Sequence, residues 1–248
     1  VCASRGQRGH GATANARWTG VRLKDVLEKA GVKPSAHQVT FDGLDRSLLP
    51  ATPDFVKALD LEQALDGEIL LAYGMNGADL PMLNGYPLRL VVPGHYGTYW
   101  IKHLNQINVL DEVFNGFWMN PAYRVPVGKF PLRDRFLTQE NATSTPITEM
   151  VVNSLITSHR NGDKIKAGKV AVSGMAWDGG YGISSVNVST DGGKTWGAAK
   201  LGEDLGRFAF RPWSFDLTAK KGNNTVTVNA TNKIGQGQIT ELIYNPAG

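Results

Sequence analysis

Apolar residues in the first half of the chain follow two different periods. They recur at i, i+3, i+4 and i+7 from Leu23 to Ala30, and Gly31 follows directly. This spacing predicts an amphipathic helix that ends at the glycine. A second helix is expected within 55–65. Short apolar runs predict strands at 39–41, 69–73 and 88–92, the last of which ends in Pro93-Gly94.

Beyond about Ile147 only the strand pattern remains. Apolar and polar residues alternate in the four segments 170–174, 183–189, 208–217 and 225–230. The sequence Asp191-Gly192-Gly193-Lys194 is typical of a hairpin turn between two of them. This spacing of strands predicts a β-sandwich.

The two halves therefore differ in class, and we predict an α+β fold of two domains. Residues 115–148 contain four prolines and several aromatic residues without either period, which favours a long irregular segment. The predicted boundary lies within 140–148, so that the domains comprise residues 1–145 and 146–248.

Composition narrows the function. The length of 248 residues suits two domains, and 42% apolar and 19% charged residues are typical of globular proteins. The longest apolar runs are far shorter than the roughly 20 residues of a membrane helix, so no membrane span is expected. The net charge is +4, and Lys and Arg are scattered, which argues against a nucleic-acid groove. This modest positive charge is compatible with a small anionic substrate or with an acidic protein partner.

Three features suggest chemistry. Cys2, the single cysteine, precedes Arg5 and Arg8, whose charges favour the thiolate form that binds soft metals; a solvated loop is the alternative. The glycine-broken turn in 91–102 could hold a phosphate, although most such turns bind nothing. In 117–124, a tyrosine beside an arginine could bind an anion, or the aromatic residues could simply pack together.

Longer motifs resemble those of sulfite oxidases and related molybdopterin oxidoreductases. Three motifs of the first half occur in the family's order: NARWTGVRL at 15–23, LAYGMNG at 71–77 and GYPLRLVVPG at 85–94. The second half is similar to the family's immunoglobulin-like dimerisation domain, in GMAW at 174–177, VNVS at 186–189 and DGGKTW at 191–196. The resemblance implies a molybdopterin-binding fold followed by an immunoglobulin-like β-sandwich.

The resemblance also implies roles for single residues. Cys2 matches the cysteine whose thiolate binds molybdenum, and Tyr123 matches the active-site tyrosine. The family's substrate arginine lies five residues after the cysteine, where this chain has Gln7, so Arg5 or Arg8 is expected to take that role.

Further positions match the family's binding of the pterin cofactor. Arg89 and Lys102 match residues that hold the pterin and its phosphate, and Gly97 and Thr98 occupy the turn that faces it. Asn84 stands where vertebrate members have a cofactor-contacting histidine.

The implied function is oxidation of sulfite to sulfate by a molybdenum-molybdopterin cofactor. The sequence has no Cys-x-x-Cys-His haem signature, so a separate cytochrome c in the bacterial periplasm is the expected electron acceptor, and a homodimer is possible. A related reductase or oxidase acting on nitrate, another oxyanion or a sulfoxide is the main alternative; a non-catalytic binding module and an adhesion module remain open. The family pattern extends beyond Val1 and Gly248, so both ends are expected to be incomplete.

Overall fold

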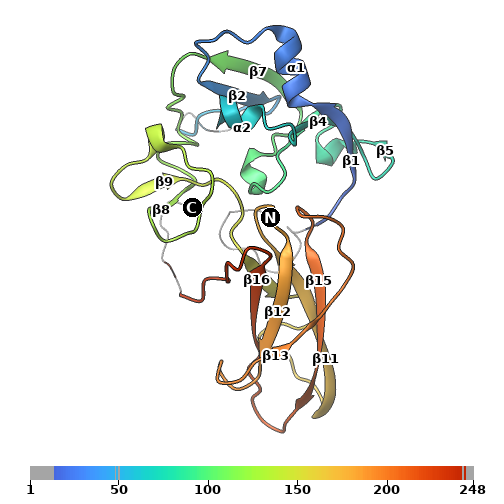
Figure 1. Cartoon of the computed structure of the whole chain (residues 1–248). Helices are drawn as coiled ribbons and strands as arrows, with labels where there is room; N and C mark the ends of the chain where they lie inside the picture. The colour runs from blue at the N-terminus through green and yellow to red at the C-terminus, as the bar shows by residue number, and fades with distance from the viewer. Residues whose placement is uncertain (1–13, 48, 50, 242, 244–248) are drawn as a thin grey trace. The chain divides into compact units, whose positions relative to one another are not determined.

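A computed structural model describes residues 14–47, 49, 51–241 and 243 of the chain. The chain forms two compact units: the second begins at Met150, and the described residue Ile243 belongs again to the first. Strands dominate both units, and Figure 1 shows that the helices are few and short. The expected α+β class is thus correct only in the coarse sense that two short helices accompany the strands of the first unit. Among the described residues, no helix has the length and apolar character needed to cross a membrane.

The described residues of the first unit form three antiparallel sheets. One sheet has the order β1-β4-β5, with β6 also paired to β4. Its strands are β1 (Trp18–Arg22), β4 (Leu70–Met75), β5 (Ala78–Asp79) and β6 (Arg89–Val91). The second sheet has the order β3-β2-β7, made of β3 (Lys57–Asp60), β2 (Gln38–Gly43) and β7 (Leu104–Leu110).

The helix predicted from the first apolar period is confirmed as α1 (Leu23–Ala30). It buries Leu23 and Leu27, and Gly31 ends it in the left-handed conformation, at φ 78°, which a residue without a side chain adopts at little cost. The 310 helices of this unit are η1 (Met82–Asn84), η2 (Gly97–Tyr99) and η3 (Leu137–Gln139).

The helix expected within 55–65 is largely wrong. Residues Lys57–Asp60 form strand β3, which pairs with β2, and only α2 (Leu61–Ala64) is helical. The Asp60 N–H donates to Gln63 Oε1 at 3.3 Å, so a capping box starts the helix late. Burial of Lys57, Ala58 and Leu59 in the sheet outweighs any local helical preference.

The segment 115–148 is irregular, as predicted, but it belongs to the first unit's core. Met119, Val125 and Phe136 are buried in the same hydrophobic cluster as α1 and β2. The short strands β8 (Arg124–Pro126) and β9 (Ser144–Pro146) pair with each other within it.

The second unit consists of two antiparallel sheets around one core. The sheet orders are β10-β11-β15-β14 and β13-β12-β16. Residues from both sheets form the core, among them Val172 and Trp213 from the first and Val186 and Ala230 from the second. The strands are β10 (Asn153–Ile156), β11 (Gly168–Trp177), β12 (Ile183–Ser189), β13 (Gly197–Ala198), β14 (Lys200–Leu201), β15 (Arg211–Ala219) and β16 (Thr227–Asn232).

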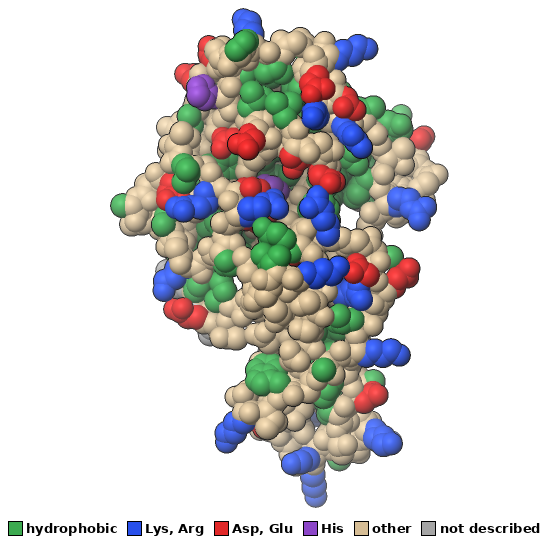
Figure 2. Space-filling view, viewed as in Figure 1, with side chains coloured by type: hydrophobic (Ala, Val, Ile, Leu, Met, Phe, Trp, Pro, Cys, Tyr) green, Lys and Arg blue, Asp and Glu red, His purple; other side chains and the backbone are tan. Residues whose placement is uncertain are grey.

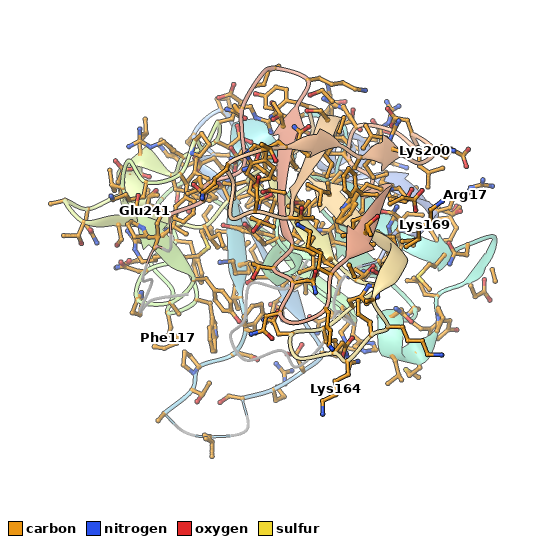
Figure 3. The ribbon with its side chains drawn as sticks, turned by 90° about the horizontal axis from the view of Figure 1, so that it is seen from below. Arg17, Phe117, Lys164, Lys169, Lys200 and Glu241 are labelled. Carbon is orange, nitrogen blue, oxygen red and sulfur yellow. The ribbon has the colours of Figure 1, made fainter. Side chains whose placement is uncertain are left out.

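The predicted turn follows β12, but it leads to the short strand β13, which pairs with β12 and is not one of the four predicted strands. Asp191 Oδ1 accepts the N–H groups of Lys194 and Thr195 at 3.0 and 2.9 Å. The Thr195 hydroxyl donates to Asp191 Oδ2 at 2.6 Å, and this bond, followed by that of the Thr195 N–H, holds the pKa of the Asp191 carboxyl at about 2. The exposed lysines of this unit, such as Lys164, Lys169 and Lys200, point outward in Figure 3.

Candidate functional site

Arg89 is the most unusual charged residue of the first unit. Its side chain lies on β6, only 8% of the residue is exposed, and no carboxylate among the described residues pairs with it. Nη1 donates to the Asn84 carbonyl at 2.9 Å, and Nη2 donates to the Trp100 carbonyl at 3.2 Å. Burial lowers the pKa of this guanidinium to about 10, which still leaves it charged at neutral pH.

Aromatic rings complete the surroundings of this guanidinium. Its central carbon lies 4.9 Å from the centroid of the Trp18 ring and 5.6 Å from that of Trp100. The two indoles meet edge to face at 5.8 Å. Because the rings shield the charge from water without neutralising it, Arg89 is a fixed cation suited to bind an anion.

Lys102 contacts the same 310 helix, η1, as Arg89 does. Its Nζ donates to the Leu83 carbonyl at 3.1 Å, so the carbonyls of η1 hold both predicted cations. Gly85, at φ 108°, follows η1, and a Cβ there would lie 3.0 Å from Arg89 Cβ and 3.1 Å from Lys102 Cα. Only glycine permits this close approach. Asn84 contributes its carbonyl to Arg89.

β6 and the turn after it contain buried polar atoms that have no hydrogen-bond partner among the described residues. These atoms are Arg89 Nε on β6, Thr98 Oγ1 on η2 and Trp100 Nε1, each of which is shielded from water. Gly97, at the start of η2, is exposed. Buried polar groups are normally paired, so this cluster fits a polar group brought by a ligand.

A loop that the sequence reading overlooked lies against Lys102. A Cβ on Gly43 would lie 2.6 Å from the Lys102 carbonyl and 2.6 Å from Asp45 Oδ1, and the Leu44 N–H donates to the His103 carbonyl at 2.9 Å. Burial, and next the charge of Asp54, raise the pKa of Asp42 at the start of this loop. The sequence feature that indicates this loop is Asp42-Gly43-Leu44-Asp45, a polar segment at the end of a buried strand.

Tyr123 occupies a backbone conformation that is rare outside glycine, with φ 56°. Its carbonyl accepts the Ile147 N–H at 2.8 Å. The next residue, Arg124, is buried and donates to the carbonyls of Met119, Gln139 and Ser144 at 3.0, 2.7 and 2.8 Å. Arg124 thus fixes the surrounding backbone through its guanidinium.

The aromatic residues around Tyr123 do pack together. Its ring centroid lies 6.0 Å from Phe55 and 5.9 Å from Trp118. Phe117 stacks edge to face on Trp118 yet is 42% exposed, and its side chain points outward in Figure 3. The packing interpretation therefore holds for the cluster, and it leaves a role for the phenol of Tyr123 open.

A buried lysine joins this cluster to the turn. Lys57 on β3 is fully buried, and its Nζ donates to the Trp118 carbonyl at 2.7 Å. The same nitrogen lies 4.5 Å from the ring centroid of Tyr99 on η2 and 5.5 Å from that of Tyr123. Lys57 carries no signal of this role in the sequence, because the local pattern of 55–65 predicts a helix there.

The structure thus brings together two groups of predicted residues. Arg89, Lys102 and Asn84 share one set of contacts with η1, and Tyr123 is linked to η2, which carries Gly97 and Thr98, through Lys57 and Tyr99. The predicted Cys2, Arg5 and Arg8 lie outside the described residues. On the visible face, Figure 2 shows Lys and Arg side chains among Asp and Glu.

Two family models match the chain. One, described as oxidoreductase molybdopterin binding domain, matches residues 2–118, and the other, described as Mo-co oxidoreductase dimerisation domain, matches residues 144–246. Fold and site therefore define a molybdopterin oxidoreductase. Within this class the chain belongs to the sulfite oxidase family, whose cofactor is molybdenum bound to molybdopterin.

Three relatives show the extent of the likeness. Mitochondrial sulfite oxidase of Homo sapiens is 36% identical over 228 residues, which are 88% of this chain and 41% of that protein. Nitrate reductase [NADH] of Spinacia oleracea is 30% identical over 264 residues, covering 97% of this chain and 28% of that protein. The crystal structure of sulfane dehydrogenase SoxCD from Paracoccus pantotrophus has a TM-score of 0.75 and 28% identity, covering 88% of this chain and 52% of that chain. The chain thus spans about half or less of each relative's length.

The described residues fit this cofactor. A pterin with a phosphate is polar and anionic, and the turn offers an unneutralised guanidinium together with unpaired buried donors. Arg89, Lys102 and Thr98 would hold it, since β6 and the turn that follows it present a donor from each of these residues.

Proposed function

We propose that this protein oxidises sulfite to sulfate and passes the electrons to a separate cytochrome c. The observation that carries the proposal is the buried, unneutralised Arg89 beside unpaired donors, in a chain of the sulfite oxidase family. When bound, the molybdenum cofactor supplies the two-electron oxidation and the oxygen transfer.

The chain's own residues would bind and orient. Arg89 and Lys102 hold the anionic cofactor, with the backbone of Asn84, Gly97 and Thr98 shaping its turn. Cys2 is proposed as the protein's metal ligand, because a thiolate suits a soft metal. Arg5 or Arg8 is proposed to bind the sulfite dianion, since a guanidinium offers planar donors and a charge independent of pH.

We further propose that the second unit is immunoglobulin-like and joins two copies of the chain. The match to a dimerisation domain and the two sheets around one core support this. A periplasmic location, where cytochromes c occur, completes the proposal. A strict monomer in light scattering of the full-length protein at micromolar concentration would contradict the dimer.

The function is tested on the full-length, molybdenum-loaded protein by following the reduction of cytochrome c. Addition of sulfite should cause reduction, and sulfate should form in the expected ratio of one per two electrons. A molybdenum-loaded protein that reduces neither cytochrome c nor an artificial acceptor with sulfite would overturn the proposal.

A second candidate function is reduction of nitrate, another oxyanion or a sulfoxide. It is favoured by the likeness to spinach nitrate reductase and by Gln7, which stands where the family's substrate arginine is expected. The same protein, supplied with a reduced dye, would then consume nitrate or dimethyl sulfoxide and leave sulfite untouched.

Replacing Tyr123 with Phe should slow sulfite oxidation. The phenol is proposed to donate a hydrogen bond to the bound oxyanion, whereas the ring contacts with Phe55 and Trp118 would remain. Loss of one hydrogen bond to a charged group costs about 1 to 3 kcal/mol, or roughly a 5- to 150-fold lower kcat/KM. Steady-state kinetics measure this, with Tyr181→Phe in the second unit as the control. Unchanged kinetics in Tyr123→Phe would show that the proposed contact does not exist.

A further inference from the structure

Lys57 is a buried amine that lies between the rings of Tyr123 and of Tyr99 on η2. Its residue has no exposed surface, and the Trp118 carbonyl, 2.7 Å from Nζ, is its hydrogen-bond acceptor. An ammonium has three N–H groups, and the rings of Tyr99 and Tyr123 flank this one at 4.5 and 5.5 Å. Aromatic faces attract a cation but do not neutralise it.

The two tyrosines are tied to the same backbone residue. The Tyr99 hydroxyl donates to the Ile147 carbonyl, and the Ile147 N–H donates to the Tyr123 carbonyl at 2.8 Å. The Lys57 amine therefore lies within a closed set of contacts that includes Tyr123. These contacts fix the distance between the Lys57 amine and the Tyr123 ring, so a change of charge on the amine changes the electrostatic potential at Tyr123.

No counter-ion for Lys57 is found among the described residues. Burial is the single cause that lowers the pKa of Lys57 to about 7, so no neighbouring charge contributes to the shift. The titratable and charged groups on the elements around it are Asp42 on β2, Asp60 at the end of β3, His95 and Tyr99 at the turn, Tyr123 and Arg124 after Trp118, and Glu149. Asp60 and Glu149 act on Tyr99 and not on Lys57.

The pKa of a buried amine without a counter-ion rises when an anion binds nearby. In the folded chain the amine is mainly neutral above pH 7, whereas an unfolded lysine keeps its proton to about pH 10.5. An anion beside Tyr123 would stabilise the protonated form through a medium of low polarity. Binding of the anion would then draw a proton from solvent.

We propose that Lys57 is a positioning residue of the anion site, which takes up a proton when an oxyanion binds beside Tyr123 and thereby supplies the missing counter-charge. This inference rests on the proposed function, because that function places the oxyanion at Tyr123. It adds to that function a group that couples substrate binding to pH.

The test measures proton uptake, which a merely structural lysine would not change. Sulfate, the product dianion, is titrated by calorimetry into the molybdenum-loaded full-length protein near pH 7.5, in two buffers of different ionisation enthalpy. A dianion about 10 Å away shifts a pKa by roughly two units at an effective dielectric constant near 20, so binding should take up roughly 0.7 of a proton. The sulfate affinity of the wild type should also rise as the pH falls from 8.5 to 6.5.

Two variants separate charge from proton transfer. Lys57→Met should bind sulfate several-fold more weakly and show no proton uptake. Lys57→Arg keeps a permanent charge, and it should retain much of the affinity while its proton uptake also disappears. Lys29→Met, which changes an exposed lysine on α1, should behave as the wild type.

Each outcome decides the inference. Absence of proton uptake in the wild type, including absence of any sulfate binding, would overturn it, and so would unchanged uptake in Lys57→Arg. If Lys57→Met does not fold, the wild type and Lys57→Arg still decide. If the wild type oxidises sulfite but takes up no proton when sulfate binds, only the proposed role of Lys57 is refuted. If sulfate binding takes up a proton but the protein does not oxidise sulfite, the proposed function is refuted.

Discussion

The rate of sulfite oxidation by the Cys2→Ser protein should fall by at least about 100-fold. Mutation of residues that merely hydrogen-bond to a metal's ligands can already lower activity by about this much, and Cys2 is proposed as a ligand itself. A hydroxyl is a hard, weakly acidic group, and it is a poor ligand for a metal that prefers thiolate. Purified variant protein is expected to retain little molybdenum by elemental analysis. Its circular dichroism should match that of the wild type, since folding of both units depends on hydrophobic cores that need no metal.

Ser4→Ala provides the matched control, because it changes a hydroxyl-bearing residue two positions away in the same segment. It should keep both molybdenum and activity. Full turnover in Cys2→Ser, with molybdenum bound, would show that the metal has another protein ligand and that the role taken from the family does not apply.

The strands of the second unit were largely predictable from sequence. Each of them has one face on a core and one in water, so apolar and polar residues alternate, and 183–189 coincides with β12. β7 was missed because its apolar positions are interrupted, and its exposed residues include Asn105, Gln106 and Asn108. β1 was missed because Gly20 lies against the backbone of Leu71, a contact between distant segments that local patterns do not contain.

The candidate site was predictable only as far as its motifs reach. The motif around Arg89 indicated an anion site, but its indole neighbours come from β1 and from the turn after β6, which a linear pattern does not bring together. Lys57 shows a different kind of failure. The strand period places it on the same face as Leu59, but a lysine is more often at the surface, and the local pattern of 55–65 predicts a helix.

The Arg89→Met substitution should greatly weaken cofactor binding but change the stability of the cofactor-free fold only little. Two terms of opposite sign act on the stability of the cofactor-free chain. The variant loses hydrogen bonds to the Asn84 and Trp100 carbonyls, each about 1.5 to 3 kcal/mol for a charged donor. It also removes a buried charge that no carboxylate compensates, and burial of that charge is unfavourable, as the lowered pKa of Arg89 indicates.

These two terms offset each other in folding but not in cofactor binding. The melting temperature of cofactor-free Arg89→Met should therefore stay within about 5 °C of the wild type, which corresponds to roughly 1 to 2 kcal/mol for a chain of this size. The anionic cofactor, by contrast, loses a charge-assisted partner without compensation, so its affinity should fall roughly 100-fold. Fluorescence of the released pterin and the molybdenum content of purified protein measure this. Arg22→Met, which alters an exposed arginine at the end of β1, should retain cofactor. Normal cofactor content in Arg89→Met, or collapse of the cofactor-free fold, would each show that this guanidinium serves the structure and not the cofactor.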